Sequence, residues 1–164
     1  MDPHGHQPAA VSVEFHFEQD AVGQRLVSKV VGGDLTGVAS DAGDDWATFA
    51  LAAAPPADVR ALDLRSDHDA AKLSERAFIL QHPNGLAKRL AFVRNRITNI
   101  EARTLLYVTD TQGGSSGSPV FNAQGKMIAM HCAGGVPQKF AGVPPVKNNQ
   151  GARIDVIAPA ILAR

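Results

Sequence analysis

Short stretches that alternate apolar and polar residues run along most of the chain. Residues 11–17 (VSVEFHF) carry an apolar side chain at every second position, which is the period of a strand with one buried face. Strand-like stretches of this kind recur about every ten to fifteen residues and leave little room for helix. This spacing predicts an all-β sandwich or barrel. The further predicted strands are 25–31, 46–51, 77–81, 90–94, 105–109, 119–121, 126–131 and 153–157.

Turn residues separate the predicted strands. Gly32-Gly33 marks the expected end of the second strand, and His82-Pro83-Asn84-Gly85 predicts a turn with positive φ at Asn-Gly. Two short helices are expected, at 69–76 and 158–164. A proline-rich stretch at 52–56 and the polar run after it predict two lobes, although a surface loop within one domain would have the same composition. The expected parts are a partial N-terminal β-barrel lobe (1–60), a connector (61–75) and a C-terminal β-barrel lobe (76–164).

The composition is that of an ordinary folded domain of 164 residues with 45% hydrophobic residues. Sixteen Lys and Arg balance sixteen Asp and Glu, so the basic excess of a nucleic-acid-binding protein is absent from the sequence. No apolar run reaches the roughly 18 residues of a membrane span. We therefore expect neither nucleic acid nor membrane as a partner. Five basic residues are expected to form a solvated strand face: Lys88, Arg89, Arg94, Arg96 and Arg103.

The one cysteine, Cys132, has no partner for an internal disulfide, and its apolar neighbours predict a buried small side chain. Residues 1–10 lack the basic start and apolar core of a signal peptide, which together with the lone cysteine predicts a cytoplasmic protein. The histidines are scattered without metal-ligand spacing. We therefore expect no metal and no cofactor.

The segment 113–119 (GGSSGSP) lies between two predicted strands and is the most informative part of the chain. A serine between glycines on a tight turn can expose its hydroxyl, and the same turn can aim backbone N–H groups into one small space. Acyl transfer needs this pairing of a nucleophile with fixed donors at the developing oxyanion. A flexible Gly/Ser loop is the alternative that the segment alone leaves open.

The run 107–122 (YVTDTQGGSSGSPVFN) resembles the nucleophile region of trypsin-like, chymotrypsin-fold serine proteases. The resemblance is strongest to their disulfide-free bacterial branch, which includes glutamyl endopeptidases and trypsin-like domains of bacterial conflict systems. It continues through residues 79–85, 130–135 and 149–154, and covers about residues 11–160. The resemblance implies a double β-barrel and hydrolysis of peptide or protein substrates through an acyl-enzyme.

The resemblance also implies roles for individual residues. Ser116 matches the nucleophile, and the backbone N–H groups of Gly114 and Ser116 match the oxyanion hole. Asp45, at the start of the run DWATFAL, matches the catalytic carboxylate, with the adjacent Asp44 as the alternative. His131 matches a residue that contacts an acidic substrate side chain in glutamyl endopeptidases.

Two further matches concern the activation of such a site and its substrate specificity. Ser115 stands where many secreted relatives carry an aspartate that pairs with a freed N-terminus, so no proteolytic activation is expected. Asp110 precedes Ser116 by six residues and could line a specificity pocket by register, or be a hydrogen-bonding turn residue.

The catalytic histidine is the member of the triad that the sequence does not supply in its usual context. His4 and His6 lie about forty residues before Asp45, but the prolines and glycine around them describe a loop rather than a supporting strand. We therefore expect an N-terminally truncated chain with an incomplete first barrel, weak or inactive alone, whose further segment or domains lie elsewhere. The alternative function is a non-catalytic peptide-binding module that retains the protease fold.

Overall fold

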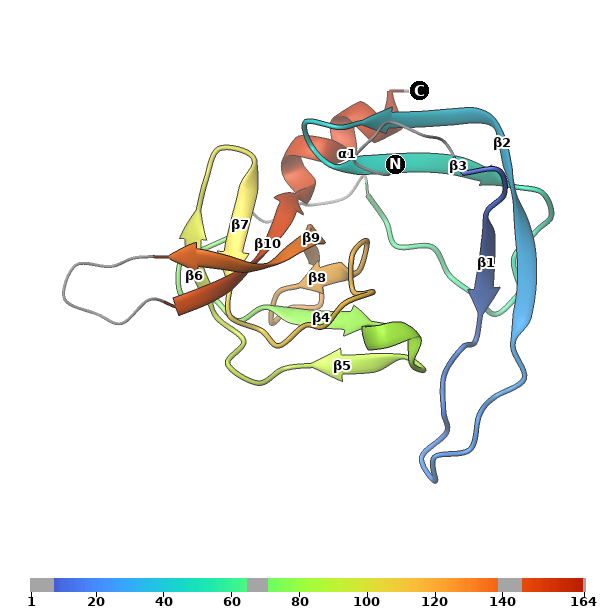
Figure 1. Ribbon diagram of the computed structural model, residues 1–164, viewed down its shortest axis with the longest axis horizontal. Coiled ribbons are helices and arrows are strands. Elements are labelled where there is room, and N and C mark those ends of the chain that lie inside the picture. Colours follow the sequence, from blue (N-terminus) through green and yellow to red (C-terminus); the bar gives the residue numbers. More distant parts are fainter. Residues whose placement is uncertain (1–7, 65–70, 139–145, 164) are drawn as a thin grey trace. The chain divides into compact units, whose positions relative to one another are not determined.

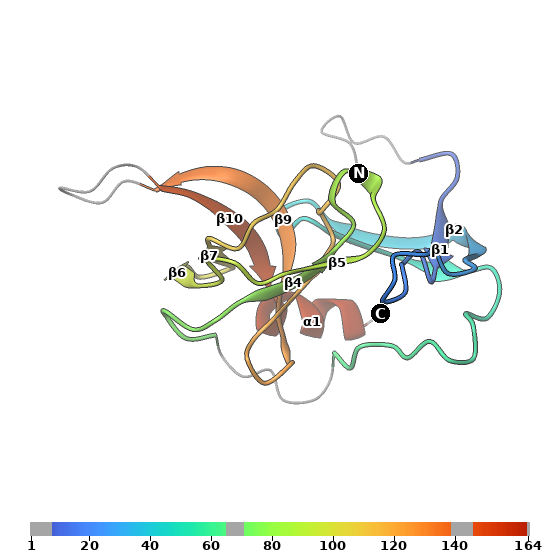
Figure 2. The same cartoon turned by 90° about the horizontal axis from the view of Figure 1, so that it is seen from below.

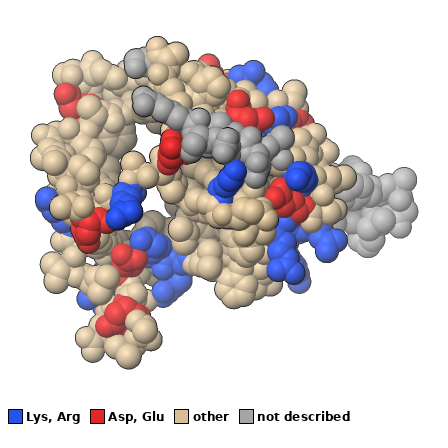
Figure 3. Space-filling model, turned by 180° about the vertical axis from the view of Figure 1, so that it is seen from behind, with Lys and Arg blue, Asp and Glu red and all other residues tan. Residues whose placement is uncertain are grey.

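The computed structural model describes residues 8–64, 71–138 and 146–163, and most of its regular structure is β-strand (Figure 1). This confirms the all-β class. The chain divides into two compact units, unit 1 (Met1–Leu62) and unit 2 (Asp63–Arg164). Acidic and basic side chains are interspersed over the face seen in Figure 3, as the balanced composition leads one to expect. Within the described ranges no helix is both long and apolar enough to cross a membrane.

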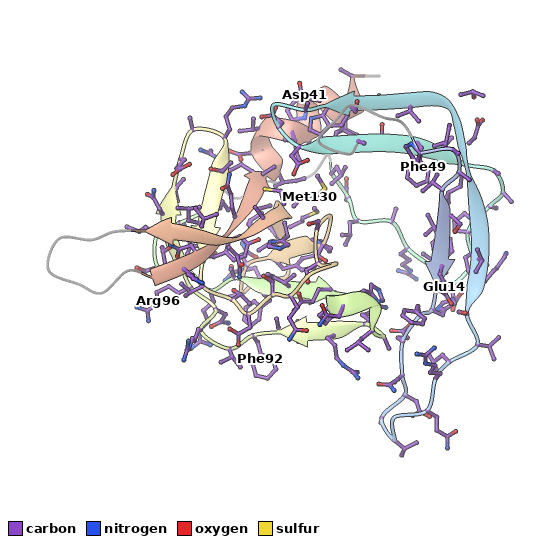
Figure 4. The ribbon with its side chains drawn as sticks, viewed as in Figure 1. Glu14, Asp41, Phe49, Phe92, Arg96 and Met130 are labelled. Atoms are coloured by element: carbon purple, nitrogen blue, oxygen red, sulfur yellow. The ribbon has the colours of Figure 1, made fainter. Side chains whose placement is uncertain are left out.

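Unit 1 contains a three-stranded antiparallel sheet in the order β1-β2-β3. Its strands are β1 (Ser12–Phe15), β2 (Lys29–Asp41) and β3 (Trp46–Leu51). The predicted end of the second strand at Gly32-Gly33 is wrong, because β2 continues through both glycines. A Cβ on Gly33 would lie 2.7 Å from the Phe49 ring, so the glycine lets β3 pack closely against β2 (Figure 4). Gly33 is thus a packing position rather than a strand end.

Unit 2 contains a seven-stranded antiparallel sheet in the order β5-β4-β8-β9-β10-β7-β6. Its buried core is formed by small and branched apolar side chains around the ring of Tyr107, which is fully buried. The long strands β9 and β10 run side by side, and α1 follows β10 (Figure 2). The elements are β4 (Phe78–Gln81), η1 (Pro83–Gly85), β5 (Arg89–Ala91), β6 (Ile97–Ile100), β7 (Thr104–Tyr107), β8 (Pro119–Phe121), β9 (Met127–Gln138), β10 (Val146–Arg153) and α1 (Ile154–Leu162).

The structure of unit 2 differs from the sequence predictions at two places, and a third prediction falls partly outside the described residues. The strand predicted at 153–157 is wrong, because a helix begins at Ile154 and buries Ile154, Ile157 and Ala158, which have helical rather than strand spacing. The strand β6 was not predicted. The helix predicted at 69–76 falls partly outside the described residues, and from residue 71 onward the chain is irregular until Arg76 pairs with Arg96.

Candidate active site

The segment between β7 and β8 exposes one serine and buries its two serine neighbours. Ser116 is exposed, whereas Ser115 and Ser118 are 0% and 9% exposed. Gly114 and Gly117 flank this stretch with φ values of +86° and +84°, a conformation that glycine adopts without strain. The glycines therefore turn the chain so that only the middle serine of the three faces solvent.

The polar groups at the tip of this turn are left available. Within the described ranges, neither the Gly114 N–H nor the Ser116 N–H finds an acceptor, and the Ser116 hydroxyl has no hydrogen-bond partner. Three neighbouring amides are bonded: Ser115 donates to the Gln112 carbonyl at 3.2 Å, Gly117 to the His131 carbonyl at 2.8 Å, and Ser118 to the Ser115 carbonyl at 3.1 Å. Two unused donors beside an exposed hydroxyl are suited to an oxygen that gains negative charge.

Gln81, at the end of β4, holds the buried side of the turn. The Ser115 hydroxyl donates to Gln81 Oε1 at 2.6 Å, and Gln81 Nε2 donates to the Asp110 carbonyl at 3.0 Å. Gln81 itself is 5% exposed. One buried amide therefore links β4 to both ends of residues 110–115. Sequence reasoning missed Gln81, and the only available signal was a polar residue ending the apolar run 77–81.

The turn after β4 supports the same segment from a second side. The Asn84 N–H donates to the Gly113 carbonyl at 2.6 Å, and Asn84 Nδ2 donates to Gln112 Oε1 at 2.9 Å. Asn84 and Gly85 have φ values of 53° and 69°, as expected for the predicted turn. A Cβ on Gly114 would lie 3.3 Å from the His82 carbonyl oxygen, so this approach needs a glycine.

Strand β9 supports the turn from a third side through His131. The Gly117 N–H donates to the His131 carbonyl at 2.8 Å, and the His131 N–H donates to the Ser118 carbonyl at 2.9 Å. The His131 backbone is thus bonded to the two residues that follow Ser116 in the chain. The His131 side chain is 4% exposed and its Nδ1 lies 2.7 Å from the Tyr107 hydroxyl.

Burial sets the protonation of this buried pair. It raises the pKa of Tyr107 well above its ordinary value, with Cys132 adding to the effect, so the phenol remains a donor. Burial also lowers the pKa of His131, although a hydrogen bond with the Gln150 main chain raises it. The Tyr107 hydroxyl is 3.4 Å from the Gln150 carbonyl, farther than from His131 Nδ1. A Tyr107 hydroxyl that donates to Nδ1 leaves the proton of the neutral ring on Nε2, whereas a protonated Nδ1 donates to the hydroxyl and frees it for the Gln150 carbonyl.

The lowered pKa of His131 predicts a loss of stability in acid. Above the ordinary histidine pKa of 6.5, both the folded and the unfolded chain hold His131 neutral. Below it, the unfolded chain binds a proton that the folded chain resists, so the free energy of unfolding falls as the pH falls. His131→Gln removes this dependence while keeping a side-chain acceptor for Tyr107. Urea unfolding between pH 8 and pH 5 is expected to show a smaller acid loss in the variant; parallel curves would contradict this.

Asp45 lies in unit 1, at the end of the turn that joins β2 to β3. It is exposed, with φ 52°, whereas the adjacent Asp44 is 8% exposed. The Asp41 carboxylate accepts the Asp44 N–H at 3.0 Å and the Gly43 N–H at 2.7 Å, which fixes the turn. The role of Asp45 as the catalytic carboxylate remains a prediction. The two neighbouring carboxylates differ in burial, since Asp44 is buried and Asp45 is exposed.

The histidines do not complete a triad within the described residues of either unit. His4 and His6 lie outside the described residues. In unit 1, His16 Nε2 is 3.3 Å from Asp58 Oδ1, and His16 Nδ1 is 3.7 Å from Glu18 Oε1. Across the described ranges, no three His, Cys, Asp or Glu side chains lie close enough to hold a metal ion. Cys132 is half-buried rather than buried, and its thiol donates to the Gln150 carbonyl at 3.4 Å.

Comparison with known proteins identifies a family and curated relatives that match part of the chain. A family model described as "Trypsin-like peptidase domain" matches residues 4–130, which include both Asp45 and Ser116. A "Glutamyl endopeptidase" of Staphylococcus aureus (strain MW2) is 39% identical over 56 residues, covering 34% of this chain and 17% of that protein. "Secreted RxLR effector protein 73" of Plasmopara viticola is 37% identical over 84 residues, covering 45% of this chain and 21% of that protein. The chain thus spans less than a quarter of the length of these curated relatives.

Proposed function

The chain belongs to the trypsin-like peptidase family, and from this we propose that it hydrolyses peptide bonds through an acyl-enzyme at Ser116. The observation that carries the proposal is the exposed Ser116 hydroxyl beside two N–H groups that have no acceptor within the described residues. The Ser116 oxygen attacks the carbonyl carbon of the substrate, and its proton passes to a general base. The Gly114 and Ser116 N–H groups then donate to the resulting oxyanion.

The carboxylate and the histidine of the proposed reaction come from residues before Ser116 in the family's chain order. The family pattern favours Asp45 as the carboxylate, whereas burial favours Asp44, which is 8% exposed. A carboxylate that orients a histidine stabilises the imidazolium that forms when the serine loses its proton. Removing the correct carboxylate is therefore expected to slow the reaction much more than removing the other.

His131 is proposed to contact the substrate side chain. In the tautomer in which Nδ1 accepts from the Tyr107 hydroxyl, Nε2 carries a proton that it can donate. A neutral donor would favour an oxygen-bearing substrate side chain without demanding a negative charge. Peptide phosphonates that carry Glu, Gln or Ala next to the phosphorus would test this preference.

Fluorophosphonate labelling, read by intact mass, tests the proposed activity. We expect one adduct that forms slowly on the wild-type chain, as for a weakly active chain, and none on Ser116→Ala, because only an activated serine reacts with the phosphorus. Ser118→Ala is the matched control and should keep the adduct, since Ser118 is buried. The rates of Asp44→Asn and Asp45→Asn would then identify the carboxylate. Variants of His4, His6 and His16 would identify the base.

Absence of labelling on folded wild-type chain would contradict the proposed activity. Peptide binding that survives Ser116→Ala, without any labelling of the wild type, would favour the non-catalytic peptide-binding module instead. Circular dichroism and a cooperative unfolding transition would establish that the chain tested is folded.

A further inference from the structure

A second feature of unit 2 is a cavity whose lining does not include Ser116 and is dominated by positive charge. This cavity of about 930 Å³ is lined by the side chains or backbone of Arg76, Arg94, Arg96 and Lys147. Arg76 precedes β4, Arg94 and Arg96 belong to the turn between β5 and β6, and Lys147 is on β10. Figure 4 shows Arg96 beside the outer end of the β9–β10 pair. Sequence analysis expected Arg94 and Arg96 on a solvated face and did not include Arg76 or Lys147.

The four cations of this cavity have few acidic neighbours among the described residues. Within the described ranges none of them forms an ion pair, and Asp110 is the one carboxylate that lines the cavity. The whole chain has no formal net charge, so four cations around one carboxylate are a local excess. Such an excess produces a positive potential that is strongest inside a concave surface.

Two of the arginines are placed directly opposite each other. Arg76 and Arg96 are antiparallel bridge partners, which puts their Cβ atoms about 4.5–5.5 Å apart on one face. Like charges in this arrangement destabilise a sheet unless an anion lies between them. An arginine pair with an anion between the two guanidinium groups would instead form charge-assisted hydrogen bonds on both sides.

The backbone fixes this turn in an uncommon conformation. Arg94 has φ 54°, in the left-handed region that favours glycine. The Arg96 N–H donates to the Arg94 carbonyl at 2.8 Å, and the Ala77 N–H donates to the Asn95 carbonyl at 2.9 Å. The Val108 N–H donates to the Arg96 carbonyl at 3.1 Å. The turn is therefore held by Ala77, just before β4, and by Val108, just after β7, which fixes the backbone from which the two arginine side chains extend.

We propose that this cavity binds a small multivalent oxyanion, one that carries two or more phosphate or carboxylate groups. The guanidinium fork matches both groups in a bidentate manner, and the Lys147 ammonium adds a point charge. The Asn95 and Asn149 amides line the same cavity and can donate to further oxygens. A single anion of low charge would leave most of the positive charge unneutralised, which is why the proposal requires several charged groups.

Titration calorimetry on the full chain at constant ionic strength tests the proposal with three probes: tripolyphosphate, citrate and inorganic phosphate. Tripolyphosphate or citrate is expected to bind at least about tenfold more tightly than inorganic phosphate, since multivalent ions reach several cations. Arg76→Gln/Arg96→Gln is expected to weaken that binding at least about tenfold. Lys88→Gln/Arg89→Gln removes two charges from the same unit outside the cavity. This control should keep the affinity for tripolyphosphate or citrate within about twofold of the wild-type value.

The outcomes separate the proposal from its alternatives. Preference for tripolyphosphate identifies a phosphorylated ligand, equal binding of citrate identifies a general multivalent oxyanion, and both support the site. Absence of binding by all three probes overturns it, as does equal weakening in the two double variants, which would reflect overall charge. Arg96→Gln alone should unfold at no lower temperature than wild type without ligand, because it relieves the opposed pair. This keeps loss of binding distinct from loss of folding.

Discussion

Replacing Gln81 by leucine is expected to lower the free energy of unfolding by about 2–4 kcal/mol and to slow the labelling of Ser116 at least about tenfold. Leucine fits a buried position but leaves the Ser115 hydroxyl and the Asp110 carbonyl without the partners they have at 2.6 Å and 3.0 Å. Each buried polar group that loses its partner costs about 1–3 kcal/mol. Gln81 is a positioning residue, since it acts on Ser116 only through Ser115.

The double variant Gln81→Leu/Ser115→Ala separates stability from reactivity. Removing both members of a buried hydrogen bond is much less costly than removing one, so urea unfolding should regain about 1 kcal/mol or more relative to Gln81→Leu. The labelling rate should not recover, because residue 115 no longer has a hydroxyl with which to anchor the turn. Recovery of the rate together with stability would mean that Gln81 affects Ser116 only by keeping unit 2 folded.

Gly114→Ala is expected to reduce labelling of Ser116 by about a hundredfold to a thousandfold, the range measured when an oxyanion donor is lost. A Cβ at this position would lie 3.3 Å from the His82 carbonyl, and φ +86° is unfavourable for alanine by about 1–2 kcal/mol. The backbone must relax by moving the Gly114 N–H, which is one of the two proposed donors. Phosphonate labelling rates and urea unfolding measure the two effects.

Gly117→Ala is the matched control for this substitution. Gly117 has nearly the same φ, +84°, but a Cβ there would meet nothing within 4 Å. We expect a similar loss of stability and a labelling rate that falls by less than about tenfold. Equal losses of rate in the two variants would show that backbone strain, and not displacement of the Gly114 N–H, controls reactivity.

The features that could be predicted from the sequence are those with a strong local signal. Strand β3 runs from Trp46 to Leu51 as its apolar stretch predicts, and the Asn84-Gly85 turn has the positive φ values that its residues favour. The turn around Ser116 follows from its glycines. Each of these depends on residues that are adjacent in the chain, so pattern reasoning finds them.

The features that were missed depend on partners that are far apart in the chain. The glycine Gly33 continues a strand because Phe49 packs over it, and Gln81 matters because Ser115, 34 positions later, donates to it. The opposition of Arg76 and Arg96 comes from an isolated bridge between segments without strong strand patterns. Such long-range pairings decide the role of a residue without leaving a local signature.

The supports of the Ser116 turn have a consequence for how the chain can change over generations. The recorded hydrogen bonds that fix residues 110–118 join them to Gln81, Asn84, His131 and Asn149, all of which are encoded after the junction at residues 62 and 63. A genetic exchange at that junction would pass on these bonds as a single inherited block. The residues that form these bonds would therefore stay together whatever sequence precedes the junction.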